Sequence, residues 1–166
     1  MKFSEIYVQD WDFYDPTEYS RYNSSGTNSA PVINNYSWDN TKDWICSFDL
    51  KVTANSQRID IVPPSESLNH HLGIGRNSGG QLSCYTGKSS SGEYQNVINS
   101  KSISTNTYYS VTIEKVGTTV TFKFDNTIVY TDNSPTWLSN YANETIKYTQ
   151  WNNGTTYIKN IKLKLS

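Results

Sequence analysis

The most regular passage of the chain, TIEKVGTTVTFKFDNTIVYTD at residues 112–132, alternates apolar and polar side chains with a period of two. This alternation is typical of a β-strand with one buried and one exposed face. Gly117 suits the first turn, and Asp125 with Asn126 suits a two-residue hairpin loop, because these residues tolerate positive φ. The passage therefore predicts an antiparallel meander. Its apolar positions are Val111 and Ile113, then Val120, Phe122 and Phe124, then Ile128 and Tyr130.

Similar segments recur along the chain, separated by short polar breaks. We expect strands at residues 4–9, 31–34, 44–53, 58–62, 70–75, 81–85, 94–98, 108–115, 119–125, 127–131, 145–150 and 156–165. Residues 16–30 and 132–144 are predicted to be long polar loops. Strands with one apolar face usually pair face to face. The pattern predicts an all-β fold, a two-sheet antiparallel β-sandwich of the jelly-roll kind. Because no linker or charge block divides the sequence, residues 1–166 are expected to form a single domain.

Charge limits the partners that this chain can have. Charged side chains are 17% of the residues and the net charge is −1. Phosphate binding needs a concentrated basic face, so no nucleic-acid partner is expected. No apolar run approaches the roughly 20 residues of a membrane helix, so membrane insertion is not expected either. The N-terminal MKFSEIYVQDWDFYD contains no apolar core of signal-peptide length.

Cys46 and Cys84 are the two cysteines of the chain. Each falls in step with apolar neighbours, Cys46 between Trp44 and Phe48 and Cys84 after Leu82. A free Cys behaves as a small buried hydrophobe, so we predict two buried thiols on adjacent core strands. A disulfide between them is the alternative, and catalysis by a cysteine is not expected.

Four segments carry a family resemblance. YYSVTIEKVGTTVTFKFDNTIVYTD resembles the late hairpins of concanavalin A-like (legume-lectin and laminin-G-like) jelly rolls. KDWICSFDLKV resembles their early core strand, HHLGIGRNSGG a central strand, and YIKNIKLKL the closing strand. The resemblance covers residues 38–166 and implies a two-sheet jelly roll whose concave face often holds glycans. Carbohydrate-binding modules and the tips of phage tail and adhesin proteins also have this fold, but the fold does not establish an activity.

The sequence does not indicate an enzyme. Glycosidases of this fold carry paired acids on one strand, and glycoside hydrolysis needs two carboxyl groups at a controlled separation. None of the glutamates lies in such a pattern, and Asp60 in RIDIV has no second acid beside it. His70 and His71 lie in neither a nucleophile elbow nor an HExxH motif. We therefore expect no catalytic residue.

Aromatic residues beside polar loops are the candidates for sugar binding. An aromatic ring offers an apolar face to a pyranose, and short polar groups around it bond the hydroxyls. Trp38, Trp137 and Trp151 lie in or beside loops rich in Asn, Asp, Ser and Tyr, whereas Trp44 is expected in the core. The predicted ligand-binding residues are Trp151, Asn152, Asn153, Trp137, Tyr141, Trp38, Arg76 and Asn77, with Tyr148 as a further contributor. The alternative is packing beneath a loop for each tryptophan and an ordinary turn for Arg76 and Asn77.

A metal site is predicted at the acids of QDWDFYD, which are Asp10, Asp12 and Asp15. Oxygen-rich clusters of this spacing can hold Ca²⁺, and several lectin-like jelly rolls carry calcium. Asp39 and Asp43, which flank Asn40, form a second candidate. The alternative in both places is a set of solvated turn acids.

Together these features predict a non-catalytic carbohydrate-binding, lectin-like module. We expect an adhesin or receptor-binding domain at a cell surface or on a virion, extracellular, with a glycan or glycosylated surface as its partner. Low affinity would be raised by repetition in a larger multidomain or oligomeric assembly. One alternative is a structural or protein-interaction module of a tail fibre or surface protein. A glycan-cleaving enzyme of the same fold is a further alternative.

Overall fold

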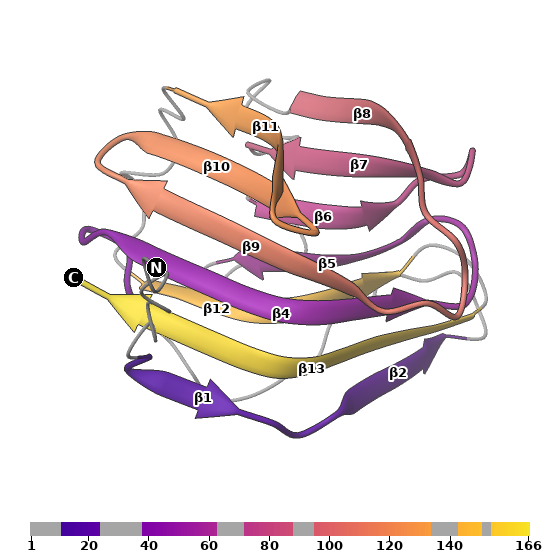
Figure 1. The fold of residues 1–166 in the computed structure, drawn as a ribbon, viewed down its shortest axis with the longest axis horizontal. Helices are drawn as coiled ribbons and strands as arrows, with labels where there is room; N and C mark the ends of the chain where they lie inside the picture. The colour runs from indigo at the N-terminus through magenta and orange to yellow at the C-terminus, as the bar shows by residue number, and fades with distance from the viewer. Residues whose placement is uncertain (1–10, 24–37, 63–71, 88–94, 134–142, 151–153) are drawn as a thin grey trace, which may run out of the picture.

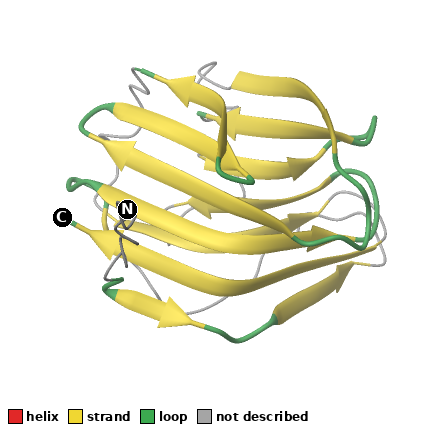
Figure 2. Cartoon of the chain, in the orientation of Figure 1, coloured by secondary structure: helices red, strands yellow, loops and turns green. Residues whose placement is uncertain are grey.

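The computed structural model describes residues 11–23, 38–62, 72–87, 95–133, 143–150 and 154–166. All regular structure in these ranges is β-strand, as Figure 2 shows. The strands predicted at 4–9 and 31–34 lie outside the described residues.

The strands form two antiparallel sheets, the first in front of the second in Figure 1. The first sheet has seven strands, in the spatial order β1 (Phe13–Asp15), β13 (Gly154–Leu165), β4 (Trp44–Val52), β9 (Tyr109–Val116), β10 (Thr119–Phe124) and β11 (Thr127–Asp132), with β2 (Tyr19–Asn23) also paired to β13. The second has six, in the order β3 (Trp38–Asp39), β12 (Asn143–Gln150), β5 (Gln57–Val62), β6 (Leu72–Arg76), β7 (Gln81–Thr86) and β8 (Gln95–Ser102). The predicted all-β, two-sheet antiparallel sandwich is confirmed.

The predicted meander is formed by β9, β10 and β11. Asp125 and Asn126 have φ angles of 47° and 60°, and Gly117 has 56°, so both tight turns use the positive φ expected of these residues. The side chains of Ile113, Phe122 and Phe124 are fully buried on one side of this sheet. The period of two therefore predicts the buried face of β9 and β10 correctly. It fails for β11, where Ile128 is 61% exposed, because the register against β10 shifts between Phe122 and Lys123.

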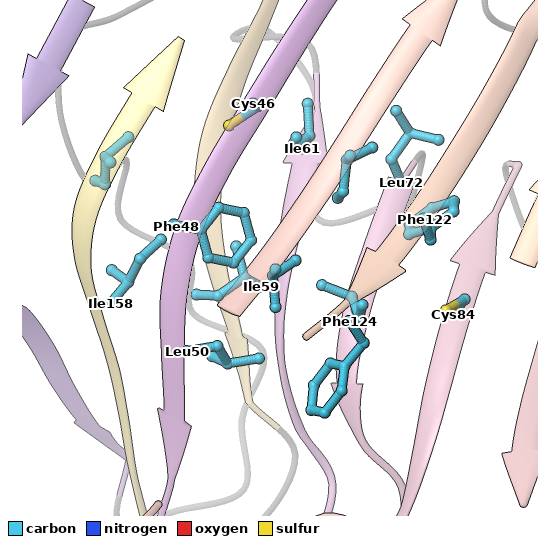
Figure 3. Packing of buried hydrophobic residues seen from close by; sticks show 14 of the residues in the cluster. Cys46, Phe48, Leu50, Ile59, Ile61, Leu72, Cys84, Phe122, Phe124 and Ile158 are labelled. Atoms are coloured by element: carbon cyan, nitrogen blue, oxygen red, sulfur yellow. The ribbon is translucent and has the colours of Figure 1, made fainter. Parts of the chain in front are cut away.

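The core fills the space between the two sheets. Figure 3 shows side chains of the first sheet, such as Phe48 and Phe122, in one layer with side chains of the second, such as Ile59 and Leu72. Burying each large apolar side chain contributes roughly 1.5–3 kcal/mol, so this layer is the main source of stability. Cys46 and Cys84 lie within it as free, buried thiols, as predicted. They belong to β4 and β7 of different sheets, so the expectation of adjacent strands is wrong.

Three short strands lie where the sequence predicts none, and one of them is β3 at Trp38–Asp39. β2 lies inside the predicted loop at 16–30, and β1 forms within the acidic QDWDFYD segment. Both are paired to β13, β1 through Tyr14 opposite Lys162 and β2 through Ser20 opposite Tyr157. An edge strand needs only main-chain partners, so a polar sequence can form one without an apolar face.

The last strand contains the irregularity that its sequence predicts. The register of β13 against β4 shifts between Lys159 and Lys162, and Asn160 has a φ of 52°. The extra residue forms a bulge, which keeps both Ile158 and Ile161 in the core. It also brings Asn160 to the outward side, where its amide bonds Asp49.

Candidate functional site

Most of the predicted sugar-binding residues lie outside the described part of the chain. These are Trp137, Tyr141, Trp151, Asn152 and Asn153. Asp10, His70 and His71 also lie outside it. The backbone of Tyr148 belongs to β12.

Trp38 lies in the core, which corrects the expectation of an exposed ring. Its side chain is only 4% exposed, and its ring meets that of Trp44 edge to face, with centroids 5.5 Å apart. Trp44 is buried as predicted, and its indole Nε1 donates a hydrogen bond of 2.9 Å to Asn40. No sugar can stack on Trp38 in this position.

Arg76 is the last residue of β6, and Asn77 begins the turn to β7, which is the alternative that the sequence left open. The side-chain oxygen of Asn77 accepts hydrogen bonds of 2.9 Å from the backbone amides of Gly79 and Gln81. The Arg76 guanidinium lies beside Gly80, where a Cβ would come within 2.7 Å of its Nη2. Asn77 is buried, so its side chain holds the turn together and is not open to a ligand.

The acids predicted to hold a metal are used within the fold. Asp12 accepts a hydrogen bond of 2.6 Å from the amide of Leu165, and Asp15 accepts one of 2.6 Å from the Tyr19 hydroxyl. Three positions along an extended chain span about 10 Å, so the two carboxylates serve separate neighbours. Hydrogen bonds from Tyr19 and Thr17 outweigh partial burial and lower the pKa of Asp15.

The second acidic candidate is also occupied by local bonds. Asp39 accepts hydrogen bonds from the amide and the hydroxyl of Thr41, at 2.9 and 2.6 Å. Asp43 accepts one of 2.6 Å from the amide of Gly117. Within the described ranges, no group of three or more His, Cys, Asp or Glu residues is arranged to hold a metal ion. The described acids of both clusters therefore act as turn and strand-end acceptors.

The outward surface of the first sheet brings together tyrosines and lysines that the sequence analysis did not single out. On β4, Trp44, Cys46, Phe48 and Leu50 point into the core, so Asp49 and Lys51 point outward. The neighbouring outward residues come from β1, β13 and the segment before β9. We call this surface the tyrosine–lysine face; it consists of Tyr14, Asp49, Lys51, Tyr108, Tyr157, Lys159, Asn160 and Lys162.

At one end of the face, Lys51 contacts two tyrosine rings. It lies directly opposite Tyr157 on β13, and its Nζ is 3.8 Å from the Tyr157 ring centroid and 4.6 Å from that of Tyr108. The Nζ of Lys159 lies 4.0 Å from the same Tyr108 ring. Each contact is a cation–π interaction at a partly exposed site, worth about 0.5–1 kcal/mol.

Hydrogen bonds hold the polar groups between the rings. The Tyr108 hydroxyl donates to Glu18. The amide of Asn160 donates a bond of 2.7 Å to Asp49, and its oxygen accepts one of 3.3 Å from Tyr14. Partial burial, followed by the bond to Glu18, raises the pKa of Tyr108 well above its ordinary value. Tyr108 therefore remains a neutral donor at physiological pH.

The other end of the face lies beyond the bulge. Lys162 is directly opposite Tyr14, and its Nζ is 5.7 Å from the ring centroids of both Tyr14 and Trp11. Tyr14 is 52% exposed. Farther along the same outward surface, a hollow of about 210 Å³ is lined in part by Ile45, Glu114 and Lys164. The face is thus a strip along the strands with accessible rings, donors and acceptors.

The outward surface of the second sheet is different, because its described polar side chains on β5 are buried. Arg58 and Asp60 alternate with the core residues Ile59 and Ile61, and they are 5% and 1% exposed. The Arg58 Nε lies 3.1 and 3.2 Å from the two carboxylate oxygens of Asp60. The guanidinium carbon lies 4.3 Å from the ring centroid of Tyr85. These groups form an internal ion pair and offer no open surface.

A signal for the tyrosine–lysine face is present in the sequence. In DLKV and YIKNIKLKL the outward positions of a period-two pattern carry Asp, Lys and Tyr. Reading those positions together, and not only the apolar ones, would have indicated a chemically distinct face. The contribution of Tyr14 had no such signal, because β1 itself was not predicted.

Comparison with known proteins supports the fold. No family model matches the sequence, and no curated protein matches it either. Among solved structures, the carbohydrate-binding module CBM66 from Bacillus subtilis matches with a TM-score of 0.63 and 10% identity, covering 90% of this chain and 96% of that one. The Caenorhabditis elegans galectin LEC-6 matches with a TM-score of 0.56 and 13% identity, over 87% of this chain and 95% of that one.

An alginate lyase from a Corynebacterium species matches with a TM-score of 0.58 and 11% identity, over 79% of this chain. The match spans 62% of the lyase's length. At such identities these likenesses show the fold alone. They confirm the concanavalin A-like jelly roll that residues 38–166 resemble.

Proposed function

We propose that this chain is a non-catalytic carbohydrate-binding module and that its glycan binds to the tyrosine–lysine face. The observation that carries the proposal is the combination, on one exposed sheet surface, of aromatic rings with charged and amide groups at hydrogen-bonding distance from one another. Two of the solved structures with this fold are named as carbohydrate binders, a carbohydrate-binding module and a galectin, which supports the same class of ligand.

The chemistry of the face suits a sugar chain. Tyr14 and the neighbouring Tyr22, which are 52% and 65% exposed, offer apolar ring surface for the hydrophobic side of a pyranose. Asp49 and Asn160 accept and donate hydrogen bonds between the rings. A lysine can leave a ring to reach a ligand at a cost of only about 0.5–1 kcal/mol. The strands hold these groups in place before a ligand arrives, which lowers the ordering cost of binding.

In the organism, we propose an extracellular setting in which the module serves as an adhesin or receptor-binding domain of a cell surface or virion. A single open face of this kind binds weakly, so function there would depend on several copies in one assembly. No helix in the described part of the chain is long and apolar enough to cross a membrane.

A glycan array probed with the purified protein tests the proposal. We expect binding to a defined class of glycan that is lost in Tyr157→Ala and Tyr14→Ala but kept in Ile128→Ala. Ile128 is 61% exposed on β11 of the same sheet and serves as the matched control. If binding survives both tyrosine variants but is lost in Trp151→Ala, the ligand site is the sequence-predicted one instead. Absence of binding by a folded sample would favour the structural or protein-interaction module.

One observation favours a second candidate, a polysaccharide-cleaving enzyme of the same fold. The observation is that the fold of this chain is shared with an alginate lyase. Incubation with polysaccharides and an assay for new reducing ends distinguishes the two. Release of reducing ends by the wild-type protein would establish the enzyme, whereas binding without release would support the non-catalytic module.

A further inference from the structure

We infer that the tyrosine–lysine face selects glycans that carry acid groups, carboxylate or sulfate, and that Lys51, Lys159 and Lys162 supply the opposing charge. The inference rests on the proposed function and specifies the class of glycan that the same face takes. The proposed binding surface extends along the strip from Tyr108 to Tyr14.

These lysines differ from four others of the described chain, which are paired or bonded within the fold. Lys123 pairs with Glu114 at 2.8 Å, and Lys164 and Lys101 lie 3.7 Å from Asp12 and Asp125. Lys115 donates a bond of 2.8 Å to the backbone carbonyl of Lys42. Lys51, Lys159 and Lys162 form no ion pair with any described residue, and their ammonium groups lie over aromatic rings instead.

The described acids nearby form no ion pair with them. Asp49 lies directly opposite Lys159 in the sheet, yet the Lys159 ammonium lies over the ring of Tyr108, and Asp49 accepts a hydrogen bond from Asn160. Glu18 accepts a hydrogen bond from the hydroxyl of Tyr108. Each carboxylate keeps its charge but is bonded to a neutral donor, so neither holds a lysine in an ion pair, and the three lysines outnumber these two acids. An acid group that displaces a ring contact gains a charge-assisted hydrogen bond, which is stronger than the contact it replaces.

The three cations form a row that suits a repeating polymer. Lys51 is level with Tyr157 on β13, Lys159 follows two residues later, and Lys162 follows after the bulge. At about 3.3 Å per residue, successive positions lie roughly 7 Å apart along the strand. A row of this kind can bind acid groups on several sugar units of one polysaccharide, while the tyrosine rings contact the sugars between them. The net charge of −1 and the small number of unpaired lysines argue against a nucleic acid as the polyanion.

Matched polysaccharides separate acid recognition from general sugar binding. Affinity electrophoresis would compare polygalacturonate with its methyl ester, and dextran sulfate with dextran, with an oligonucleotide as a further probe. We expect retardation by an acidic polymer and not by its neutral partner, weakened when NaCl is raised from about 0.05 M to about 0.5 M, because salt screens exposed charges. The two pairs distinguish carboxylate from sulfate recognition.

The lysine variants test the residues themselves. Lys51→Gln, Lys159→Gln and Lys162→Gln should each weaken binding of the retained acidic polymer roughly threefold, as expected for exposed ion pairs, and the triple variant roughly 30-fold. The triple Lys→Arg variant should keep most of the affinity because the charges remain. Lys42→Gln, which removes an exposed lysine off the face, is the matched control. Circular dichroism melts of every variant establish that each is folded.

The outcomes separate this inference from the proposed function. Equal binding of a neutral polymer and its acidic partner, unchanged in the triple Gln variant, would overturn the inference while leaving the carbohydrate-binding module intact. No binding of any polysaccharide, acidic or neutral, would overturn both. Tighter binding of the oligonucleotide than of either acidic polymer would replace the glycan by a nucleic acid. Retention that falls equally in Lys42→Gln and in the single face variants would show non-specific ion exchange and also overturn the inference.

Discussion

Replacing Asp60 by Asn is expected to destabilise the protein strongly while leaving glycan binding unchanged. Asp60 and Arg58 are 1% and 5% exposed, so the substitution removes one charge of a buried ion pair. Breaking such a pair from one side costs about 3–5 kcal/mol, whereas an exposed pair is worth about 0–1 kcal/mol. The burial of the pair therefore decides the magnitude.

Urea denaturation followed by tryptophan fluorescence measures this change. With a slope of about 2 kcal/mol per molar urea, the unfolding midpoint should fall by about 2 M. Replacing both partners together, in Arg58→Met with Asp60→Leu, should recover most of the loss because no buried charge is left alone. A loss below about 1 kcal/mol in Asp60→Asn would refute the reasoning, since the pair would then behave as an exposed one. Affinity for the glycan should not change, because the pair lies on the opposite sheet.

Three further predictions follow from local geometry. Burial raises the pKa of the thiols of Cys46 and Cys84 from 9.0 to about 12, so neither should react with Ellman's reagent before unfolding. As the pH rises, the thiols ionise in the unfolded chain before they ionise in the folded protein. The free energy of unfolding should therefore fall above about pH 9, by up to about 1.4 kcal/mol per pH unit for each thiol. A melting temperature that stays constant up to pH 11 would contradict this prediction. Gly73→Ala places a Cβ 2.2 Å from Oδ1 of Asp60 and should cost about 1–3 kcal/mol in urea denaturation, whereas Gly79→Ala, whose nearest contact is 3.4 Å, should change stability by less than about 0.5 kcal/mol. Asn126→Val forces a β-branched residue to a φ of 60° and should cost about 1–2 kcal/mol, while Asn126→Gly should be nearly neutral; equal melting temperatures for the two variants would show that the hairpin does not depend on this conformation.

The sequence predicts this fold well where apolar and polar side chains alternate. Phe122 and Phe124 show the buried face of β10, and the interrupted alternation after Ile158 predicts the bulge of β13. The prediction fails at β1 and β2, because edge strands are held by main-chain bonds to β13 and need no apolar pattern. It also misplaces the two thiols on neighbouring strands, since a period of two shows which side of a strand is buried but not which strands are neighbours.

The candidate site is harder to predict, because it depends on which outward residues the sheet order brings together. Trp38 follows a polar loop in the sequence, yet its ring is packed against Trp44. The amide side chain of Asn77 is of a type that binds ligands, but its oxygen already accepts two hydrogen bonds from the backbone of its own turn. Tyr14, Lys51 and Tyr108 meet on one surface only because β13 lies between β1 and β4. That order depends on pairings between opposite ends of the sequence.

The position of β13 also determines when this protein can fold. It is the last strand in the sequence, yet it lies between β4 and the first two strands, as Figure 1 shows. On the ribosome, β4 must therefore wait with one long edge unpaired until residues 154–165 have emerged. Such distant pairings slow folding, and an open edge invites association with other chains. Synthesis, more than the finished structure, is thus the stage at which this chain is most exposed to aggregation and most dependent on chaperones.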